Sequence, residues 1–433
     1  MPLPRELDAS TLVARVKSGQ LSAAEIAESV IERIAARDAE VQAWAYFDAD
    51  LVRARAAELD AMPVKGPLHG VPVAIKDVFN TKDMPTGHNS ARYEGSRPGV
   101  DAAAVDVLRA AGAIIFGKTV TTEFAATLRG GKTRNPHDLT RTPGGSSSGS
   151  AAAVADFQST LALGTQTGGS TIRPASFNGV FALKPTWNSI SREGFKMGTI
   201  TADTVGLYAR SATDLALLAD VFDLDAPESP LPTTLAGARV ALCRTPHWDQ
   251  AAPEMRRAMA EAEASLSAAG AVVTELTLPP PFDEFAEAQK RIGARETRST
   301  FLNEYRTTPG LHDEFRARVE NRTGQLPSET RAAYRLVDRC RGLFDDIAVQ
   351  YDIIVAPSAA GEAPLGTDFT GNASFNSLWT LLHAPVCNVP GFTGPSGMPV
   401  GLSLIGREFD DRKVIAMAAL AAVAFSQTQA VAA

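Results

Sequence analysis

Two serines set in glycine-rich runs constrain this 433-residue chain more than any other feature. Ser146 lies in the segment GGSSSGS, which leads straight into an alanine-rich helical pattern. Ser170 follows Gly168-Gly169 where the apolar strand pattern LALGT ends. Glycines beside a serine leave the backbone N–H groups free to turn toward a reacting oxygen. A mere linker of this composition has no reason to adjoin a buried element twice, so the two turns are candidates for one site.

A lone lysine, Lys76, ends the apolar strand pattern VPVAI upstream of both serines. An ordinary lysine, with a pKa of about 10.4, is neutral in only about one molecule per thousand near pH 7.4. Burial and hydrogen bonds to neutral hydroxyls would lower that pKa and turn the amine into a base. Asp77 would keep the lysine charged if its carboxylate lay close, so we expect it to point away from Lys76.

These residues predict a hydrolase whose base is not histidine. In this interpretation Ser170 is the nucleophile, Ser146 passes a proton, and neutral Lys76 is the final base. The backbone N–H groups of Thr167, Gly168 and Gly169 are predicted to form an oxyanion hole. The plainer interpretation is also open at this stage: the Gly/Ser run is a flexible connection and the lysine is a solvated strand end.

Two rival motifs occur in the same sequence. The segment 112–119, GAIIFGKT, matches the phosphate-loop pattern, but its residues AIIF favour a strand and a helical pattern precedes it. The segment 145–149 matches the GxSxG nucleophile elbow with Ser147 at its centre, although a loop pattern precedes it instead of a strand. For the elbow, His312 and His383 lie downstream as candidate bases, which makes it the stronger rival.

The composition fits a soluble globular enzyme and excludes several other classes. Hydrophobic residues make up 45% of the chain, and the net charge of −7 argues against a broad nucleic-acid-binding face. Three scattered cysteines give no disulfide framework, and six histidines without ligand spacing predict no metal and no cofactor. No signal pattern opens the chain and no apolar run is long enough to cross a membrane, so we expect a cytoplasmic protein.

Helical and strand patterns alternate along the chain, which is typical of an α/β sheet protein. Ser22 and Glu25 form a capping box before an apolar helical repeat, and residues 281–350 are charged and mostly helical, as expected of a cover over the core. The segment 397–406 is expected as two short strands around a glycine turn. Other expected strands are 71–75, 113–116, 161–164, 180–183, 238–243, 271–276 and 351–358.

The chain closely resembles the amidase signature family. The segment GVPVAIKD carries the family's lysine at Lys76, GGSSSGSAAAV carries its bridging serine at Ser146, and TGGS carries its nucleophile at Ser170. The segments GKTVTTEF, RNPHD, ALKPT and MPVGLSLIG match further stretches. The resemblance runs from about residue 10 to 415 and is weakest between 240 and 350.

The resemblance implies one large α/β/α domain over 1–433, built on a twisted mixed sheet flanked by helices. Its core would be about 60–235 and 350–425, with a variable helical cover over about 240–350. It also implies cleavage of an amide C–N bond through an acyl-enzyme, without a metal or cofactor. The family's cis peptide before the bridging serine would fall on Gly145-Ser146.

Two departures from the commonest family pattern resemble a short, malonamidase-like branch. Gln166 stands where an acidic residue is usual, and an arginine follows the nucleophile by three positions as Arg173. The fork of an arginine side chain suits a carboxylate or a planar urea-like group, although Arg173 is equally expected to brace the loop. Ala125 is expected to line the acyl pocket. The predicted substrate is a small polar amide, such as a half-amide of a dicarboxylic acid or a biuret-like compound.

Three functions stay open from the sequence. The first is a free-standing amidase, with cleavage of esters or carbamates as a variant on the same site. The second is the amide-cleaving, A-type component of an amidotransferase, which works with a partner protein. The third is a silent binding protein, which retention of Lys76, Ser146 and Ser170 argues against. A homodimer is the ordinary assembly for such an enzyme and is left open.

Overall fold

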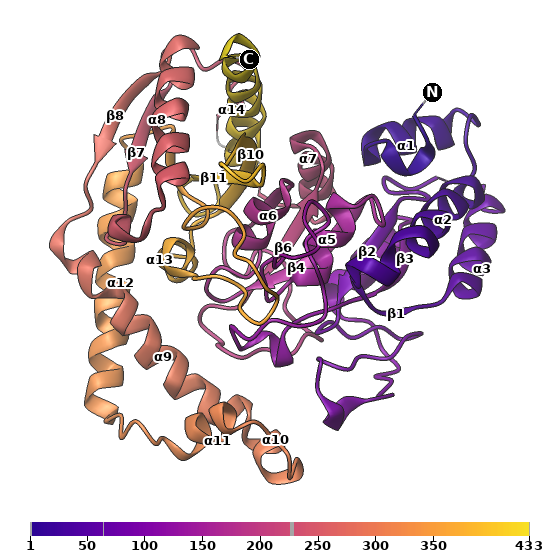
Figure 1. The fold of residues 1–433 in the computed structure, drawn as a ribbon, viewed down its shortest axis with the longest axis horizontal. Helices are drawn as coiled ribbons and strands as arrows, with labels where there is room; N and C mark the ends of the chain where they lie inside the picture. Colours follow the sequence, from indigo (N-terminus) through magenta and orange to yellow (C-terminus); the bar gives the residue numbers. More distant parts are fainter. Residues whose placement is uncertain (1, 64, 226–228, 433) are drawn as a thin grey trace.

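Short apolar strands form one mixed sheet of eleven strands in the computed structural model, which describes residues 2–63, 65–225 and 229–432. Figure 1 shows the sheet running across the molecule, with the N-terminal helices at one end and β7 and β8 at the other. The strand order is β1-β3-β2-β4-β6-β5-β10-β11-β9-β7-β8. In chain order the strands are β1 (Trp44–Phe47), β2 (Pro72–Lys76), β3 (Ile114–Thr119), β4 (Leu161–Gln166), β5 (Phe181–Lys184), β6 (Thr204–Ala209), β7 (Arg239–Cys243), β8 (Val272–Leu276), β9 (Ile353–Pro357), β10 (Val386–Thr393) and β11 (Pro399–Ile405).

Helices pack on both faces of the sheet because its central strands are apolar on both sides. Along β2, for example, Val73 and Ile75 join one hydrophobic cluster, whereas Ala74 between them joins the other. The first cluster also takes residues from α1, α4, α7, α8 and α14; the second takes residues from α3, α5, α6, α12 and α13. The helices are α1 (Ala9–Lys17), α2 (Ala23–Val41), α3 (Ala49–Asp60), α4 (Ala103–Ala110), α5 (Ser148–Ala155), α6 (Ile172–Asn178), α7 (Ala212–Val221), α8 (Pro253–Ala268), α9 (Phe285–Thr300), α10 (Leu302–Thr307), α11 (Asp313–Glu320), α12 (Pro327–Ala348), α13 (Ser374–Leu381) and α14 (Asp411–Ala432).

The parallel strands β3, β2 and β4 create the edge on which the candidate site is built. β2 pairs in parallel with β3 on one side and with β4 on the other. The carboxyl ends of adjacent parallel strands lie at the same edge of a sheet, where α/β proteins place their ligands. Lys76 ends β2 and Gln166 ends β4, so the lysine and the turn that carries Ser170 come together.

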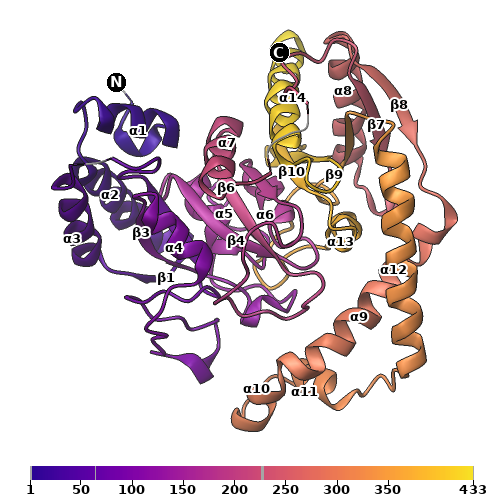
Figure 2. The same cartoon turned by 180° about the vertical axis from the view of Figure 1, so that it is seen from behind.

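The helices α9 to α12 form an arm that projects away from the sheet. Figures 1 and 2 show α9 and α12 side by side along this arm, with α10 and α11 at its tip. A separate aromatic cluster at the tip joins the arm to the core: Phe301 and Phe315 pack on Phe124, which belongs to a short 3-10 turn, Glu123–Ala125. The arm therefore contacts the rest of the molecule at both of its ends.

The predicted fold class, a mixed sheet flanked by helices, is confirmed. The capping box is present, because Ser22 accepts from the Glu25 N–H and Glu25 accepts from the Ser22 N–H. Two details differ. β7 and β8, which lie within the range expected as cover, are part of the main sheet. The segment 397–406 holds one strand, β11, instead of two, because Gly401 continues the pairing with β10 at Pro390.

Candidate active site

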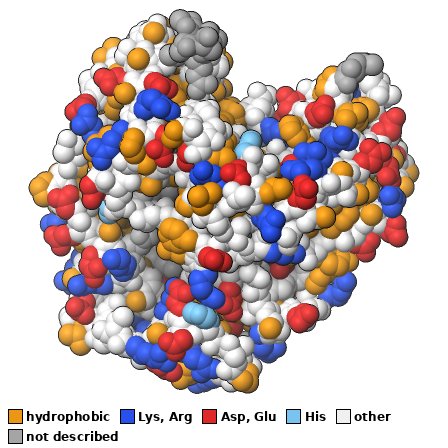
Figure 3. Space-filling view, in the orientation of Figure 1, with side chains coloured by type: hydrophobic (Ala, Val, Ile, Leu, Met, Phe, Trp, Pro, Cys, Tyr) orange, Lys and Arg blue, Asp and Glu red, His pale blue; other side chains and the backbone are white. Residues whose placement is uncertain are grey.

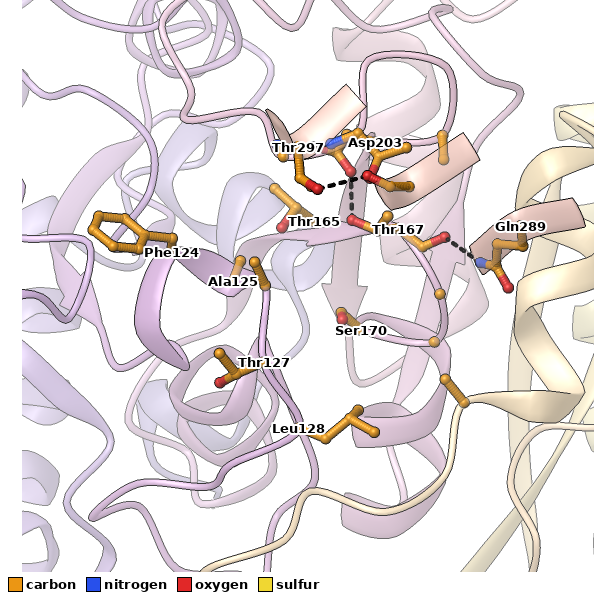
Figure 4. Close-up of a pocket in the computed structure, with 18 of the residues that line it drawn as sticks. Phe124, Ala125, Thr127, Leu128, Thr165, Thr167, Ser170, Asp203, Gln289 and Thr297 are labelled. Carbon is orange, nitrogen blue, oxygen red and sulfur yellow. Dashed lines mark hydrogen bonds between the residues drawn. The ribbon is translucent and has the colours of Figure 1, made fainter. Parts of the chain in front are cut away.

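A cavity of about 460 Å³ opens at the carboxyl edge of β4. Ser170 and the glycines before it line one wall, and Ala125 with Thr127 and Leu128 line another. Figure 4 shows Ser170 with Thr165, Thr167 and Asp203 on one side and Thr127 and Leu128 on the other. Helix α9 contributes Gln289, Ile292 and Thr297, so the arm closes part of the cavity.

Lys76 is buried completely and faces two hydroxyl groups. Its Nζ lies 2.7 Å from Oγ of Ser146 and 2.7 Å from Oγ1 of Thr165. Burial holds the pKa of Lys76 well below the ordinary lysine value, and the Arg173 guanidinium acts in the same direction. The Asp203 carboxylate opposes this shift in pKa. An amine in such surroundings gives up its proton far more readily than a surface lysine does.

Ser146 and Ser147 reach the sheet because two glycines allow helix α5 to approach closely. A Cβ on Gly149 would collide with the carbonyl oxygen of Ala43, and a Cβ on Gly164 would lie 2.8 Å from Oγ of Ser147. The peptide bond between Gly145 and Ser146 is cis, as the family resemblance implies. The backbone N–H of Ser147 donates to the carbonyl oxygen of Ser170 at 3.3 Å, which brings the two serine turns side by side.

The turn before Ser170 holds its carbonyl groups outward. The Thr167 carbonyl accepts from Gln289 at 3.5 Å, the Gly168 carbonyl accepts from Thr380 at 3.0 Å, and the Gly169 carbonyl accepts from the Arg173 N–H at 3.0 Å. In a trans peptide the N–H of the next residue points the opposite way. The N–H groups of Gly168, Gly169 and Ser170 donate to no other group among the described residues. They are therefore free to bind an oxygen.

Arg173 is buried and lines the cavity. Its Nη2 donates to the carbonyl oxygen of Gly145 and to Oγ1 of Thr370, so the side chain braces the turn before Ser146. Its Nε and Nη1 have no hydrogen-bond partner within the described residues, and no carboxylate there pairs with the guanidinium. Burial lowers the pKa of Arg173 to about 10, so the group is still charged near neutral pH. A buried charge with free donors is a ready site for an acceptor.

Asp77 points away from Lys76, as predicted, and pairs with Lys118 on the neighbouring strand. Nζ of Lys118 lies 3.0 Å from Oδ1 of Asp77 and also donates to the Phe79 carbonyl and to Thr86. Burial raises the pKa of Asp77, and the Lys118 ammonium opposes that rise. Lys118 thus takes up the acidic neighbour that would otherwise hold Lys76 charged.

Replacing Lys118 by methionine is expected to destabilise the fold by about 3–5 kcal/mol, because it leaves a buried carboxylate without its counter-ion. The measurement is the free energy of unfolding in urea. The matched control is Lys82→Met, which breaks a partly exposed ion pair with Asp101 and should cost less than about 1 kcal/mol. Equal losses for the two variants would contradict the expectation.

The two rival motifs do not form their expected sites. The phosphate-loop match lies inside β3, where Gly117 and Lys118 are buried in the sheet and no helix follows. In the elbow match, Ser147 is buried and bonds to the backbone of Thr165. His312 caps α11, and His383 stacks on Trp187; neither histidine lines the cavity.

Two polar residues of the site were not predicted. Thr165 is the second hydroxyl on Lys76, and Asp203 accepts from the Thr167 hydroxyl and from the N–H groups of Gly198 and Thr199. Burial raises the pKa of Asp203. Thr165 was hidden because a threonine at a strand end is ordinary, and Asp203 because it reaches the site from a loop more than thirty residues downstream. Over the described ranges, no cluster of His, Cys, Asp and Glu could hold a metal ion, and no helix is long and apolar enough to span a membrane.

A family model described as Amidase matches residues 25–415. The chain belongs to the amidase family. The A-type component of the glutamyl-tRNA(Gln) amidotransferase of Roseiflexus sp. (strain RS-1) is 32% identical over 465 residues, covering 96% of each protein. Native peptide amidase from Stenotrophomonas maltophilia is 30% identical with a TM-score of 0.78, covering 97% of each chain. The corresponding amidotransferase component from Thermotoga maritima is 26% identical with a TM-score of 0.80, covering 96% of this chain and 94% of that one.

The family and its members indicate an enzyme that hydrolyses amide C–N bonds. The predicted family membership is thereby confirmed. Between the functions left open by the sequence, the curated relatives favour the amidotransferase component over the free-standing amidase. A silent binding protein has no support among them.

Proposed function

We propose that this chain cleaves the C–N bond of a small amide through an acyl-enzyme on Ser170. The observation that carries the proposal is the fully buried Lys76, whose Nζ lies 2.7 Å from Oγ of Ser146. The adjacent Ser170 turn supplies a hydroxyl beside free N–H donors. These are the parts that acyl transfer requires: a nucleophile, a base within reach and donors for the oxyanion.

The proton moves along the two serines to the lysine. Ser170 gives its proton to Oγ of Ser146 while Ser146 gives its own to the lone pair of Lys76, and the Ser170 oxygen bonds to the amide carbon. The N–H groups of Gly168, Gly169 and Ser170 bind the resulting alkoxide, a refinement of the predicted Thr167, Gly168 and Gly169 set. Lys76 then returns the proton through Ser146 to the nitrogen, and the C–N bond breaks. Water enters by the same route and releases the acid.

Arg173 favours an acyl group that ends in a carboxylate or another strong acceptor. Its Nε and Nη1 are unpartnered at the cavity wall, and the charge has no counter-ion among the described residues. Ala125 belongs to the opposite wall, as expected of a residue that lines the acyl pocket. The substrate class is therefore a half-amide of a small dicarboxylic acid or a comparable acidic amide.

A second function at the same serine is favoured by the curated relatives, which are A-type components of glutamyl-tRNA(Gln) amidotransferase. In that case the chemistry on Ser170 is unchanged, and the ammonia passes to a partner protein instead of being released. Positive and negative side chains are interspersed over the face drawn in Figure 3, so this face offers no broad basic surface for RNA. The three buried, unpaired cysteines fit the proposed cytoplasmic location.

The test is ammonia release by the purified single chain from a panel of half-amide acids, neutral amides, ureas and carbamates, with Ser170→Ala as the blank. We expect half-amide acids to be preferred, and Arg173→Met to lower their kcat/KM by about 10- to 100-fold through a higher KM, because a charged hydrogen bond is lost. Arg173→Lys keeps the charge but not the fork and should recover only part of the loss.

A neutral amide of the same size is the matched substrate, because loss of the brace on Gly145 would slow both substrates equally. Preference for bulky neutral amides, unaffected by Arg173→Met, would end the acidic-substrate proposal. Ammonia release that occurs only when a partner protein is added would favour the amidotransferase function.

A further inference from the structure

Lys76 has a second hydroxyl partner in addition to the one that the proton route uses. Nζ contacts Oγ of Ser146 and Oγ1 of Thr165 at the same distance, 2.7 Å, and all three side chains are buried. The route through Ser146 does not require Thr165. Thr165 also lines the cavity beside Ser170.

The hydrogen-bonding capacity of an amine explains what a second hydroxyl does. A neutral lysine has two N–H donors and one lone pair, and only the lone pair can take the proton from Ser146. With one hydroxyl neighbour, rotation about the Cε–Nζ bond would place a donor or the lone pair on Ser146 with similar ease. A second hydroxyl that accepts an N–H fixes this rotation.

We propose that Thr165 is a positioning residue that accepts an N–H of Lys76 and thereby aims the amine lone pair at Ser146. The inference rests on the proposed function of Ser170 as nucleophile. The Thr165 backbone is itself held, because its N–H donates to Oγ of Ser147 and its carbonyl accepts from the same hydroxyl, both at 3.2 Å. The acceptor oxygen is thus attached to the same pair of elements, β4 and the start of α5, that carries the serines.

The charges around Lys76 are few, and none replaces Thr165. Asp203 raises the pKa of Lys76 from the β6 side, and Arg173 of α6 lowers it. Asp77, next to Lys76 in sequence, is engaged by Lys118 of β3. No hydrogen bond from Nζ to any of these groups occurs in the part of the chain that the structure describes.

The test is Thr165→Val, which keeps the shape of the side chain and removes the acceptor. The readout is the rate at which an alkyl fluorophosphonate labels Ser170, followed by intact-protein mass spectrometry across pH. In labelling, the Ser170 oxygen bonds to phosphorus, fluoride leaves, and the serine proton enters the Ser146–Lys76 route. This readout needs no knowledge of the amide substrate.

We expect Thr165→Val to lower the plateau labelling rate by about 10- to 100-fold, because the lone pair is no longer aimed. We also expect the rising acid limb to move to lower pH by about one unit, because the ammonium loses an acceptor and the pKa of Lys76 falls further. A purely structural role would lower the plateau without moving the limb. Thr165→Ser restores the acceptor and should stay within about threefold of the wild type in both respects.

Thr160→Val is the matched control, because it is the same substitution just before β4, at a buried hydroxyl with no hydrogen-bond partner among the described residues. It should leave labelling unchanged. If Thr165→Val does not fold by circular dichroism, Thr165→Ala carries the same expectations. An unmoved limb, or a Thr165→Ser enzyme as slow as the valine variant, would overturn the inference. Labelling of Ser170 without ammonia release from any amide would instead refute the proposed function.

Discussion

Replacing Lys76 by alanine is expected to lower kcat/KM for ammonia release by about 10³- to 10⁴-fold, the usual contribution of a positioned general base. The wild-type rate should rise with pH as the ammonium loses its proton, and level off above a pKa that burial holds well below the ordinary lysine value. The alanine variant should lack this limb, because the group that titrates is gone. The measurement is the pH profile of kcat/KM with an acidic amide.

Lys76→Arg separates a base from a fixed positive charge. Arginine stays protonated under all assay conditions. It should therefore be as inactive as alanine if Lys76 acts by accepting a proton. An arginine variant that keeps a large part of the activity would show that the site needs a cation and would refute the proton route.

Replacing Ser170 by alanine is expected to abolish the acyl-enzyme, because the Ser170 hydroxyl is the one that stands beside the free N–H groups of the described turn. Rapid quenching during turnover, followed by mass spectrometry, should detect the mass of the acyl group on the wild-type peptide that contains Ser170. The alanine variant should show no adduct, and hydroxylamine should yield no hydroxamate from it.

Ser147→Ala is the informative comparison for this second expectation. Ser147 is the serine of the elbow pattern, but it bonds to the backbone of Thr165 and is fully buried. The Ser147→Ala enzyme should still form the adduct on Ser170. An adduct that disappears with Ser147 and survives the loss of Ser170 would reinstate the elbow mechanism.

The parts of the site that local sequence determines could be predicted. Lys76 and the Ser170 turn each follow an apolar strand, and because β2 and β4 are parallel neighbours their ends meet at one edge. The orientation of Asp77 was also predictable in direction, since a carboxylate near the amine would have spoiled it as a base. Its partner, Lys118, was visible only as part of a misleading phosphate-loop pattern.

Residues whose role depends on tertiary contact could not be found from the sequence. Thr165 and Asp203 are ordinary residues until the fold places them beside Lys76 and Thr167. The pattern of Arg173 allowed either a brace or a ligand group, and the structure gives its guanidinium both a bond to Gly145 and two free donors. Gly401 suggested a turn, although a glycine also fits inside a strand when neighbouring side chains crowd it, as Asn388 does here.

The arm gives this enzyme a modular construction. Its tip is attached to the core by a few polar contacts, such as Glu304 with Lys196 at 2.6 Å and with Tyr93 at 2.6 Å. One stretch of chain, 285–348, thus supplies a cavity wall, while the reacting groups come from another, 76–173. Evolution can exchange the first stretch and so change which molecules enter, without disturbing the chemistry that the second performs.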